Sequence, residues 1–499
     1  MTRPTPQTVV VAGATGTVGR ALGRVLPERF DLVGLTRDAS RADAETDDRW
    51  EWRLCDLYSR ADTFRALHGA DFAIYLAHTA RPSARLTQAA TEDLDLLCAD
   101  NFARAAAHHD LKQIVQLQSL LHEFEFVGPD RRDALTRTLG STGVPTTTFV
   151  TDIVVGPGGT ASRALERLVR RLPVMICPSW TTIPLRVVDA DDVADTLGGA
   201  LGEASLFGAT RQLSGPEETT YLELMRQTAH RLGKRRWFLR APMVAVGLSA
   251  LWVSLFAGLP FRMMRHFVRQ VCRRSEPVQT EPDLRRLLTD LQGTLERSLE
   301  SSPSAEAPET PDTTLPDRRG DGGEVAKRGT EAVRSVQRLP LPPGRDASWA
   351  AAEYTRWLPR AMAPFLHVEV DETQSASFYL RPLPWPLLVL SYAPKVSRPD
   401  RQLYWIAGGM LAAEQDRGRL EFREILDGRY VLAAIHEFHP ALPWLIYRFT
   451  QAVVHLWVMR QFGRHLAEVP RDSDASRRSD RLGTNQPGAP PEPENPEQP

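Results

Sequence analysis

A glycine-rich turn near the start of the chain limits what this sequence can fold into more than any other feature. Residues 8–13 (TVVVAG) form a continuous apolar run, as expected for a strand buried on both faces. The turn GATGTVG follows at 13–19, and a helical stretch covers about 20–26. A buried strand, a glycine turn and a helix in this order predict the first unit of a parallel α/β sheet that binds a dinucleotide.

The three glycines of this turn have separate predicted roles. Gly13 permits the tight turn, Gly16 lets the backbone approach a pyrophosphate, and Gly19 lets the helix pack closely on the strand. The start of the helix presents free N–H groups and the positive end of its dipole to the anion. The residues expected to bind the cofactor on this turn are Gly13, Thr15, Gly16, Thr17, Val18 and Gly19.

The segments that follow alternate between strands and helices. Short strands are expected at 31–37, 51–56, 72–77 and 113–119, with helical stretches such as 94–108 between them. This alternation predicts βαβ units and therefore an α/β fold with a doubly wound parallel sheet of the Rossmann type. A dinucleotide lies across the carboxyl ends of such strands, so further contacts are expected there.

The end of the second strand bears on the choice of cofactor. A fold that prefers NAD tends to place an acid there to hold the ribose 2′-hydroxyl, whereas this chain has Arg37, with Arg20 and Arg41 nearby. A cation at this position suits a 2′-phosphate. We therefore favour NADP over NAD, and NAD stays open because Asp38 could turn inward.

The ends of the next strands supply other candidates. Asp56 and Leu57 could receive the adenine edge, although Asp56 could equally cap a loop or helix. Backbone at Ala77 and His78 would pass the cofactor, and we interpret His78 as a polar wall residue rather than a catalyst.

Composition divides the chain into two folded blocks. Residues 301–330 hold one Leu, one Val and no aromatic residue, and 470–499 are rich in Pro, Glu and Asp, so neither segment can offset the entropy of ordering. The expected organisation is a Rossmann domain over 1–275 with substrate-side helices from about 155, an amphipathic helix plus disordered linker over 276–345, an α+β domain over 346–467 and a disordered tail over 468–499.

The second block is expected to curve an antiparallel sheet around one closing helix, at about 443–466. The turn Leu426-Asp427-Gly428-Arg429 indicates a hairpin. Two interpretations stay open: a filled core, or a cavity for a fatty or isoprenoid ligand. The residues expected to face inward are, on the strands, Leu403, Trp405, Ala407, Leu420, Phe422, Val431, Ala433 and Ile435, and, on the helix, Leu445, Phe449, Ala452, Val453, Leu456 and Met459.

Charge, cysteine content and one apolar stretch indicate what the protein can contact and in which compartment it works. The 61 basic and 62 acidic residues leave a net charge of −1, which excludes a globally basic nucleic-acid binder. Four widely separated cysteines indicate buried thiols in a reducing cytoplasm, with no disulfide framework and no metal site, and no signal peptide is seen. Residues 241–260 lack any charge and are flanked by arginines; a spanning helix and a buried or interfacial helix in peripheral contact with a membrane both stay open.

Motifs along both blocks point to a family. GATGTVG, Asp56-Leu57, DNFA at 100–103, RLPVMICP at 171–178, VDADDVA at 188–194 and GPE…YLELM at 215–225 together resemble the atypical short-chain dehydrogenase/reductases, above all the NmrA-like and complex-I-subunit-like branches. WIAGG at 405–409, GRLEF at 418–422 and PALPW at 440–444 resemble a domain of unknown function fused after that half in one bacterial branch, which is similar to the START-like, helix-grip lipid-binding fold. The resemblance covers about 8–275 and 346–467.

The resemblance implies NAD(P) binding and, in active members, hydride transfer that uses a Ser and a Tyr-x-x-x-Lys pair. Ser119 matches the Ser and would also lie at the cofactor, but Gly128 falls on the Tyr position and Arg132 on the Lys position. His122 and Glu123 could substitute, or they could be surface residues of a loop, so the catalytic residues stay unknown.

Two functions therefore remain open. One is an NADP-dependent oxidoreductase for an apolar carbonyl, quinone or lipid-like substrate. The other is a non-catalytic NAD(P)H-sensing or assembly protein whose second domain binds a lipid or a partner.

Overall fold

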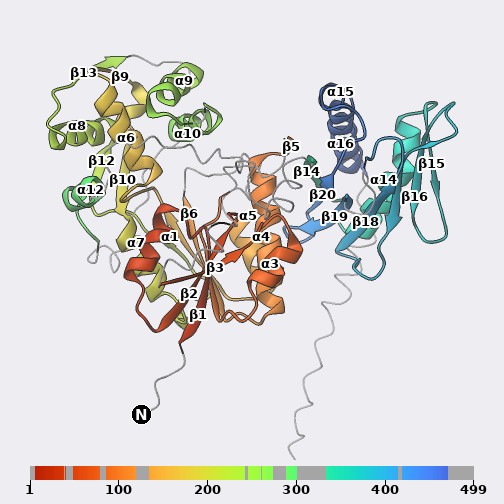
Figure 1. The fold of residues 1–499 in the computed structure, drawn as a ribbon, viewed down its shortest axis with the longest axis horizontal. Helices are drawn as coiled ribbons and strands as arrows, with labels where there is room; N and C mark the ends of the chain where they lie inside the picture. The colour runs from red at the N-terminus through yellow and green to blue at the C-terminus, as the bar shows by residue number, and fades with distance from the viewer. Residues whose placement is uncertain are drawn as a thin grey trace, which may run out of the picture. The chain divides into compact units, whose positions relative to one another are not determined.

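The computed structural model divides the chain into two compact units (Figure 1). It describes residues 6–38, 40, 49–78, 86–119, 134–241, 246–259, 261–273, 288–300, 333–413 and 418–469. Unit 1 comprises Met1–Pro82 and Ala90–Ala326, and unit 2 comprises Ser83–Ala89 and Lys327–Pro499.

Unit 1 is built on a seven-stranded sheet in which every neighbouring pair is parallel. In sheet order the strands are β11 (Thr210–Gln212), β7 (Thr146–Thr151), β6 (Gln113–Ser119), β4 (Phe72–Tyr75), β1 (Gln7–Ala12), β2 (Phe30–Thr36) and β3 (Trp50–Leu54). The expected doubly wound α/β sheet is confirmed. The order reverses between β1 and β4, and this switch point is where open α/β sheets bind their ligands.

Helices cover this sheet because the strands are apolar on both faces. Val9, Val10 and Val11 of β1 are completely buried, as the continuous apolar run predicts. The connecting helices are α1 (Thr17–Val25), α3 (Arg60–Ala66), α4 (Thr91–His108), α5 (Ala134–Gly140) and α7 (Ala190–Gly199).

The rest of unit 1 has a core of its own. A three-stranded sheet is formed by β8 (Ile153–Val155), β10 (Pro184–Asp189) and β12 (Glu218–Thr220), and a two-stranded sheet by β9 (Val174–Pro178) and β13 (Trp237–Ala241). The helices of this part are α6 (Thr160–Arg171), α8 (Tyr221–Arg231), α9 (Val246–Ala257), α10 (Phe261–Arg273) and α12 (Leu291–Glu300). Among the described residues, no helix combines the length and the apolar character needed to cross a bilayer. The amphipathic helix α12 packs back on unit 1, where Leu291 and Leu295 are buried.

Unit 2 is an eight-stranded sheet with helices α14 (Ala347–Ala361) and α16 (Gln451–Glu468) packed on one face. In order its strands are β15 (Leu366–Val370), β16 (Ala376–Leu380), β17 (Pro386–Tyr392), β18 (Arg401–Gly408), β19 (Arg419–Ile425), β20 (Tyr430–Phe438), β14 (Val333–Pro340) and β5 (Leu86–Gln88). All pairs are antiparallel except β14 with β5. The predicted hairpin at 426–429 joins β19 to β20.

The predicted inner face of unit 2 is right for β19 and β20 and wrong for β18. Leu420 pairs with Tyr404, and Phe422 pairs with Gln402, so Tyr404 and Ile406 share their face toward the helices. Leu403 and Trp405 lie on the opposite face. Both alternations along β18 are apolar, so the sequence pattern alone does not fix which one faces inward.

The closing helix also differs from the prediction because it breaks at Thr450. A short helix, α15 (Trp444–Phe449), ends there, and α16 starts with a new phase. Ala452 and Met459 are buried as expected, but the break leaves three predicted core residues exposed: Leu445, Phe449 and Val453. Tyr447, Val458, Phe462 and Leu466 fill the core instead.

Unit 2 takes one strand from inside the sequence of unit 1. Residues 86–88 form β5, which pairs with β14 in parallel. Gln88 is anchored twice: its carbonyl accepts from Gln337 Nε2 at 2.7 Å, and its Nε2 donates to the Ala452 carbonyl at 2.8 Å. Unit 2 therefore includes β14 and β5, both of which precede the expected start at 346.

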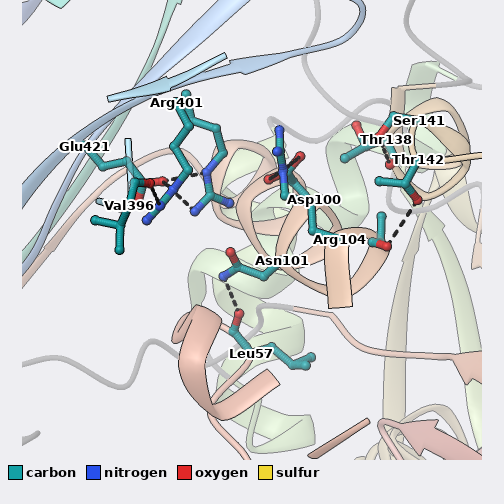
Figure 2. Close-up of polar contacts among 12 residues, drawn as sticks. Leu57, Asp100, Asn101, Arg104, Thr138, Ser141, Thr142, Val396, Arg401 and Glu421 are labelled. Carbon is teal, nitrogen blue, oxygen red and sulfur yellow. Dashed lines mark hydrogen bonds and ion pairs between the residues drawn. The ribbon is translucent and has the colours of Figure 1, made fainter. Parts of the chain in front are cut away.

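A buried ion cluster lies on the helix-free face of this sheet. Glu421 pairs with Arg401 (Figure 2). Glu421 also accepts from Arg423 Nε at 2.7 Å, and His436 Nε2 lies 3.6 Å from its second carboxylate oxygen. Burial raises the pKa of Glu421, but Arg423, His436 and Arg401 outweigh it and hold that pKa well below its usual range.

The pairing of β5 with β14 predicts how the chain behaves when it is cut between the two units. With a specific protease site placed within 305–325, the two fragments should co-elute after cleavage, because β5 stays on the first fragment and β14 on the second. Thr87→Pro should let the cleaved fragments separate, since proline cannot donate to the ladder, whereas Thr87→Ser should not. Size-exclusion chromatography gives the readout. Cleaved Thr87→Pro protein that still co-elutes would show that β5 is not what joins the fragments.

The ion cluster predicts a stability loss on neutralising Glu421. Glu421→Gln leaves Arg401 and Arg423 buried without their counter-charge, which should cost about 3–5 kcal/mol in urea unfolding at pH 7. A depressed carboxyl pKa contributes stability above about pH 4.3 that is lost as the pH falls further, so the difference between the two proteins should shrink in acid. Glu437→Gln is the matched control, because its pair with Arg419 is partly exposed and should be worth about 0–1 kcal/mol. If Glu421→Gln and Glu437→Gln lost the same free energy of unfolding, Glu421 would not act as the buried counter-charge of Arg401 and Arg423.

Candidate dinucleotide site

The glycine turn leaves β1 at the switch point of the sheet. Gly13 has φ +92°, a conformation that favours glycine, and its carbonyl accepts the Gly16 N–H at 3.0 Å to close the turn. A Cβ on Gly13 would lie 2.9 Å from the carbonyl carbon of Leu76, at the end of the neighbouring β4. The turn and β4 therefore approach each other as closely as the backbone permits.

The other two glycines differ in what requires them. A Cβ on Gly19 would lie 2.4 Å from the Ala14 carbonyl oxygen, so close packing of α1 on the turn demands glycine there. Gly16, at the N-cap of α1, has φ −74°, and a Cβ would meet only the Gly13 oxygen, at 3.2 Å. Contacts within the protein require glycine at positions 13 and 19. At position 16 a side chain would meet little of the protein, so a glycine there is better explained by a ligand that approaches the start of α1.

A second glycine loop faces the first. Gly156-Pro157-Gly158-Gly159 opens α6, and a Cβ on Gly159 would lie 3.0 Å from Thr17 Oγ1. Arg20 joins the two loops, donating to the Thr15 carbonyl at 2.7 Å and the Gly158 carbonyl at 3.2 Å. The predicted site did not include this loop, although four turn residues directly before an amphipathic helix are a readable signal in the sequence. Arg20 is thus engaged with backbone of the two loops.

Arg37 follows β2, with its side chain exposed at the end of the strand. Asp38 turns to its own loop: its N–H donates to Thr36 Oγ1 at 3.1 Å, and its carboxylate accepts from the N–H and hydroxyl of Ser40. The end of β2 thus carries an exposed Arg37 next to an Asp38 whose carboxylate is engaged in its own loop. Arg41 lies outside the described residues.

The loop after β3 is held by a buried amide. Asn101 of α4, fully buried, donates from Nδ2 to the Leu57 carbonyl at 2.9 Å (Figure 2). Asp56 uses a carboxylate oxygen locally, accepting the Tyr58 N–H at 3.2 Å, which is the capping role left open from the sequence. Asn101 belongs to the DNFA motif, so that motif fixes the backbone of the candidate adenine loop.

Ala77 and His78 continue the end of β4. The Leu76 N–H donates to the Ala12 carbonyl at 2.8 Å, so this segment runs beside the glycine turn. His78 is exposed at the end of this segment, and its role as a polar wall residue stays a prediction.

Ser119 closes β6, and its hydroxyl donates to the Asp152 carbonyl at 3.0 Å. The positions matched to the Tyr and Lys of the family, Gly128 and Arg132, lie outside the described residues, as do His122 and Glu123. Tyr75 cannot replace the missing tyrosine readily, because burial holds its pKa well above the usual value. In the described part of the chain, no three His, Cys, Asp or Glu side chains gather closely enough to hold a metal ion.

Comparisons with known proteins agree with this geometry for part of unit 1. Residues 13–139 match the model of the NAD(P)H-binding family. The auxiliary protein GraX of Staphylococcus aureus is 29% identical over 120 residues, which are 24% of this chain and 38% of GraX. The chain thus matches well under half the length of this curated relative.

Solved structures resemble the chain at low identity. A nucleoside-diphosphate-sugar epimerase from Staphylococcus aureus is 16% identical, with a TM-score of 0.43 over 58% of this chain and 99% of its own. The Citrobacter triphenylmethane reductase complexed with NADP(H) is 17% identical, with a TM-score of 0.45 over 59% of this chain and 100% of its own. From the family match and the sheet topology, the chain carries an NAD(P)-binding domain of the Rossmann type.

Proposed function

We propose that the chain is an NADP-dependent oxidoreductase acting on an apolar carbonyl, quinone or lipid-like substrate. The observation that carries the nucleotide part is Gly16, the glycine of the turn that internal packing explains least, at the uncapped start of α1. Its neighbours form a cradle of two glycine loops joined by Arg20. NADPH bound there would supply the hydride.

The position of each proposed cofactor residue in the fold indicates which part of NADPH it would contact. The turn residues Gly13 to Gly19 would hold the pyrophosphate through backbone N–H groups, and Arg37 would pair with the 2′-phosphate. Asp56 and Leu57 would border the adenine, while Ala77, His78 and Ser119 would line the path toward the nicotinamide. Support for NADP over NAD comes from the exposed Arg37 and from the engagement of the Asp38 carboxylate with Ser40.

A second candidate function rests on Gly128 and Arg132. Glycine has no proton to give, and arginine keeps its proton, so the tyrosine–lysine route is closed at these positions. A non-catalytic NAD(P)H-sensing or assembly protein would need no such pair. Unit 2 would then hold a lipid or a partner, and its sheet with helices on one face is compatible with the START-like arrangement. A cytoplasmic location with peripheral membrane contact through 241–260 completes the proposal.

Turnover separates the two candidates. Protein purified with its nucleotide should oxidise NADPH when short-chain quinones or apolar aldehydes are added, followed by the loss of NADPH absorbance. Tight NADPH binding without turnover on any of these substrates would favour the sensing protein. An absence of nucleotide binding would contradict both.

Gly16→Asp tests the pyrophosphate site. A carboxylate there would repel the phosphates, so NADPH affinity should fall at least about 100-fold. The fold should survive, because aspartate is a favoured N-cap residue. Gly19→Ala is the contrasting variant: it should lower the urea midpoint through its clash with Ala14. If Gly16→Asp still quenches NADPH fluorescence as the unaltered protein does, the site is wrongly placed.

Arg37→Ala tests the cofactor preference. Loss of a charge-assisted hydrogen bond to the 2′-phosphate should weaken NADPH by about 1–3 kcal/mol and leave NADH nearly unchanged. Arg37→Lys should recover part of the NADPH affinity, since the charge is kept. Fluorescence titrations with both nucleotides measure the difference, and equal losses for NADPH and NADH would remove the argument for NADP.

A further inference from the structure

The two-stranded ribbon of unit 1 exposes an apolar ladder. β9 and β13 pair in parallel, with Trp237 opposite Val174 and Leu239 opposite Ile176. Residues two apart on a strand share a face, so these four side chains lie together. They are 44–73% exposed, whereas Met175 and Cys177, on the other face, are buried in the core. The ribbon is thus covered on one face and open on the other.

Helix α9 continues this pattern without a single charged residue. Ser249, Ala250, Val253 and Ala257 are its buried side. Leu248, Leu251 and Leu255, spaced by three and four residues, form the opposite side and are 45–65% exposed. A helix that is apolar on all sides is normally covered on all sides, so the leucine side lacks its expected cover.

The ribbon and α9 flank one turn of α6. Arg236, at the entrance to β13, donates to the Val169 carbonyl at 2.7 Å and to the Arg170 carbonyl at 3.2 Å. Arg171, on the same turn, donates to the Phe256 carbonyl at 3.1 Å. Figure 1 draws β9, β13, α6 and α9 at one end of unit 1. We call the exposed side chains of these elements the apolar face: Val174, Ile176, Trp237, Leu239, Leu248, Leu251 and Leu255.

Positive charge is concentrated in the sequence segments that carry the apolar face. The segments 160–178, 232–241 and 246–273 contain twelve Arg or Lys residues and one acid, Glu166. Glu166 is buried and bound to Arg170 at 2.9 Å, so it offsets the charge of that arginine and leaves a net excess of eleven cations (12 − 1) in these segments. The whole chain has a net charge of −1, which makes this concentration of cations local.

We propose that unit 1 docks on an anionic lipid bilayer through the apolar face and the cations of the segments that carry it. The proposal deepens the peripheral membrane contact through 241–260 and rests on that part of the proposed function, not on catalysis. Apolar side chains with a tryptophan enter the interface, while each nearby Arg or Lys adds attraction to anionic headgroups. A second copy of the chain fits less well, because two such faces would bring like charges together.

Vesicle sedimentation with the full chain tests the proposal. The protein should sediment with vesicles of phosphatidylcholine and phosphatidylglycerol, sediment little with phosphatidylcholine alone, and release as the salt concentration rises. Trp237→Ser with Leu239→Ser should reduce binding at least about tenfold. Lys234→Glu with Arg235→Glu should do the same at low salt.

Phe449→Ser is the matched control, since Phe449 is 69% exposed on α15 of unit 2 and should not matter. NADPH titration of the same samples reports separately on the cofactor site, so a failure of docking and a failure of nucleotide binding are distinguishable. Unchanged vesicle binding by the Trp237/Leu239 variant would overturn the proposal, as would loss of binding by Phe449→Ser alone. A concentration-dependent dimer that the Trp237/Leu239 variant abolishes, with no vesicle binding, would assign the face to a second copy instead.

Discussion

The arrangement of unit 1 depends on the close approach of α1 to the turn that leads into it. Without a Cβ at residue 19, the first turn of α1 can lie against the Ala14 backbone, and the helix start then sits at the carboxyl end of β1. The same approach brings Thr17 against the second glycine loop and leaves Arg20 within reach of both loops. One missing methyl group therefore positions the helix end, the cradle and the cation that joins its two sides.

Unit 2 depends on a different constraint: its sheet is completed by β5 and β14, two strands that precede the rest of this unit in the sequence. β14 lies between β20 and β5, and Gln88 is held by side-chain and backbone bonds on both β14 and α16. Because β5 begins eight residues after His78, the same stretch of chain that passes the proposed nicotinamide side goes on to enter this sheet. The chain order thus ties the second unit covalently to the carboxyl end of β4.

Features set by neighbouring residues were predictable from the sequence, and features set by distant ones were not. The strand–turn–helix at 8–26 and the hairpin at 426–429 are local patterns, and both are observed. The face of β18 depends on its pairing with β19, and the phase of the closing helix changes at Thr450, so periodicity alone misassigned Leu403 and Leu445. β5 is three residues long and carries no recognisable period. The loop at 156–159 is also a local pattern, and its four turn residues before an amphipathic helix make it readable from the sequence.

The two open surfaces of unit 1 constrain the function together. The proposed cofactor edge lies at the glycine loops, and the loop at 156–159 leads directly into α6, whose far end is flanked by the apolar face. A twelve-residue helix with a rise of about 1.5 Å per residue spans about 18 Å, so one rigid element would link the nucleotide to a lipid surface. A sensing protein would use the same element to relate nucleotide state to membrane residence, so the docking face fits both candidate functions and the chemistry at 119–132 decides between them.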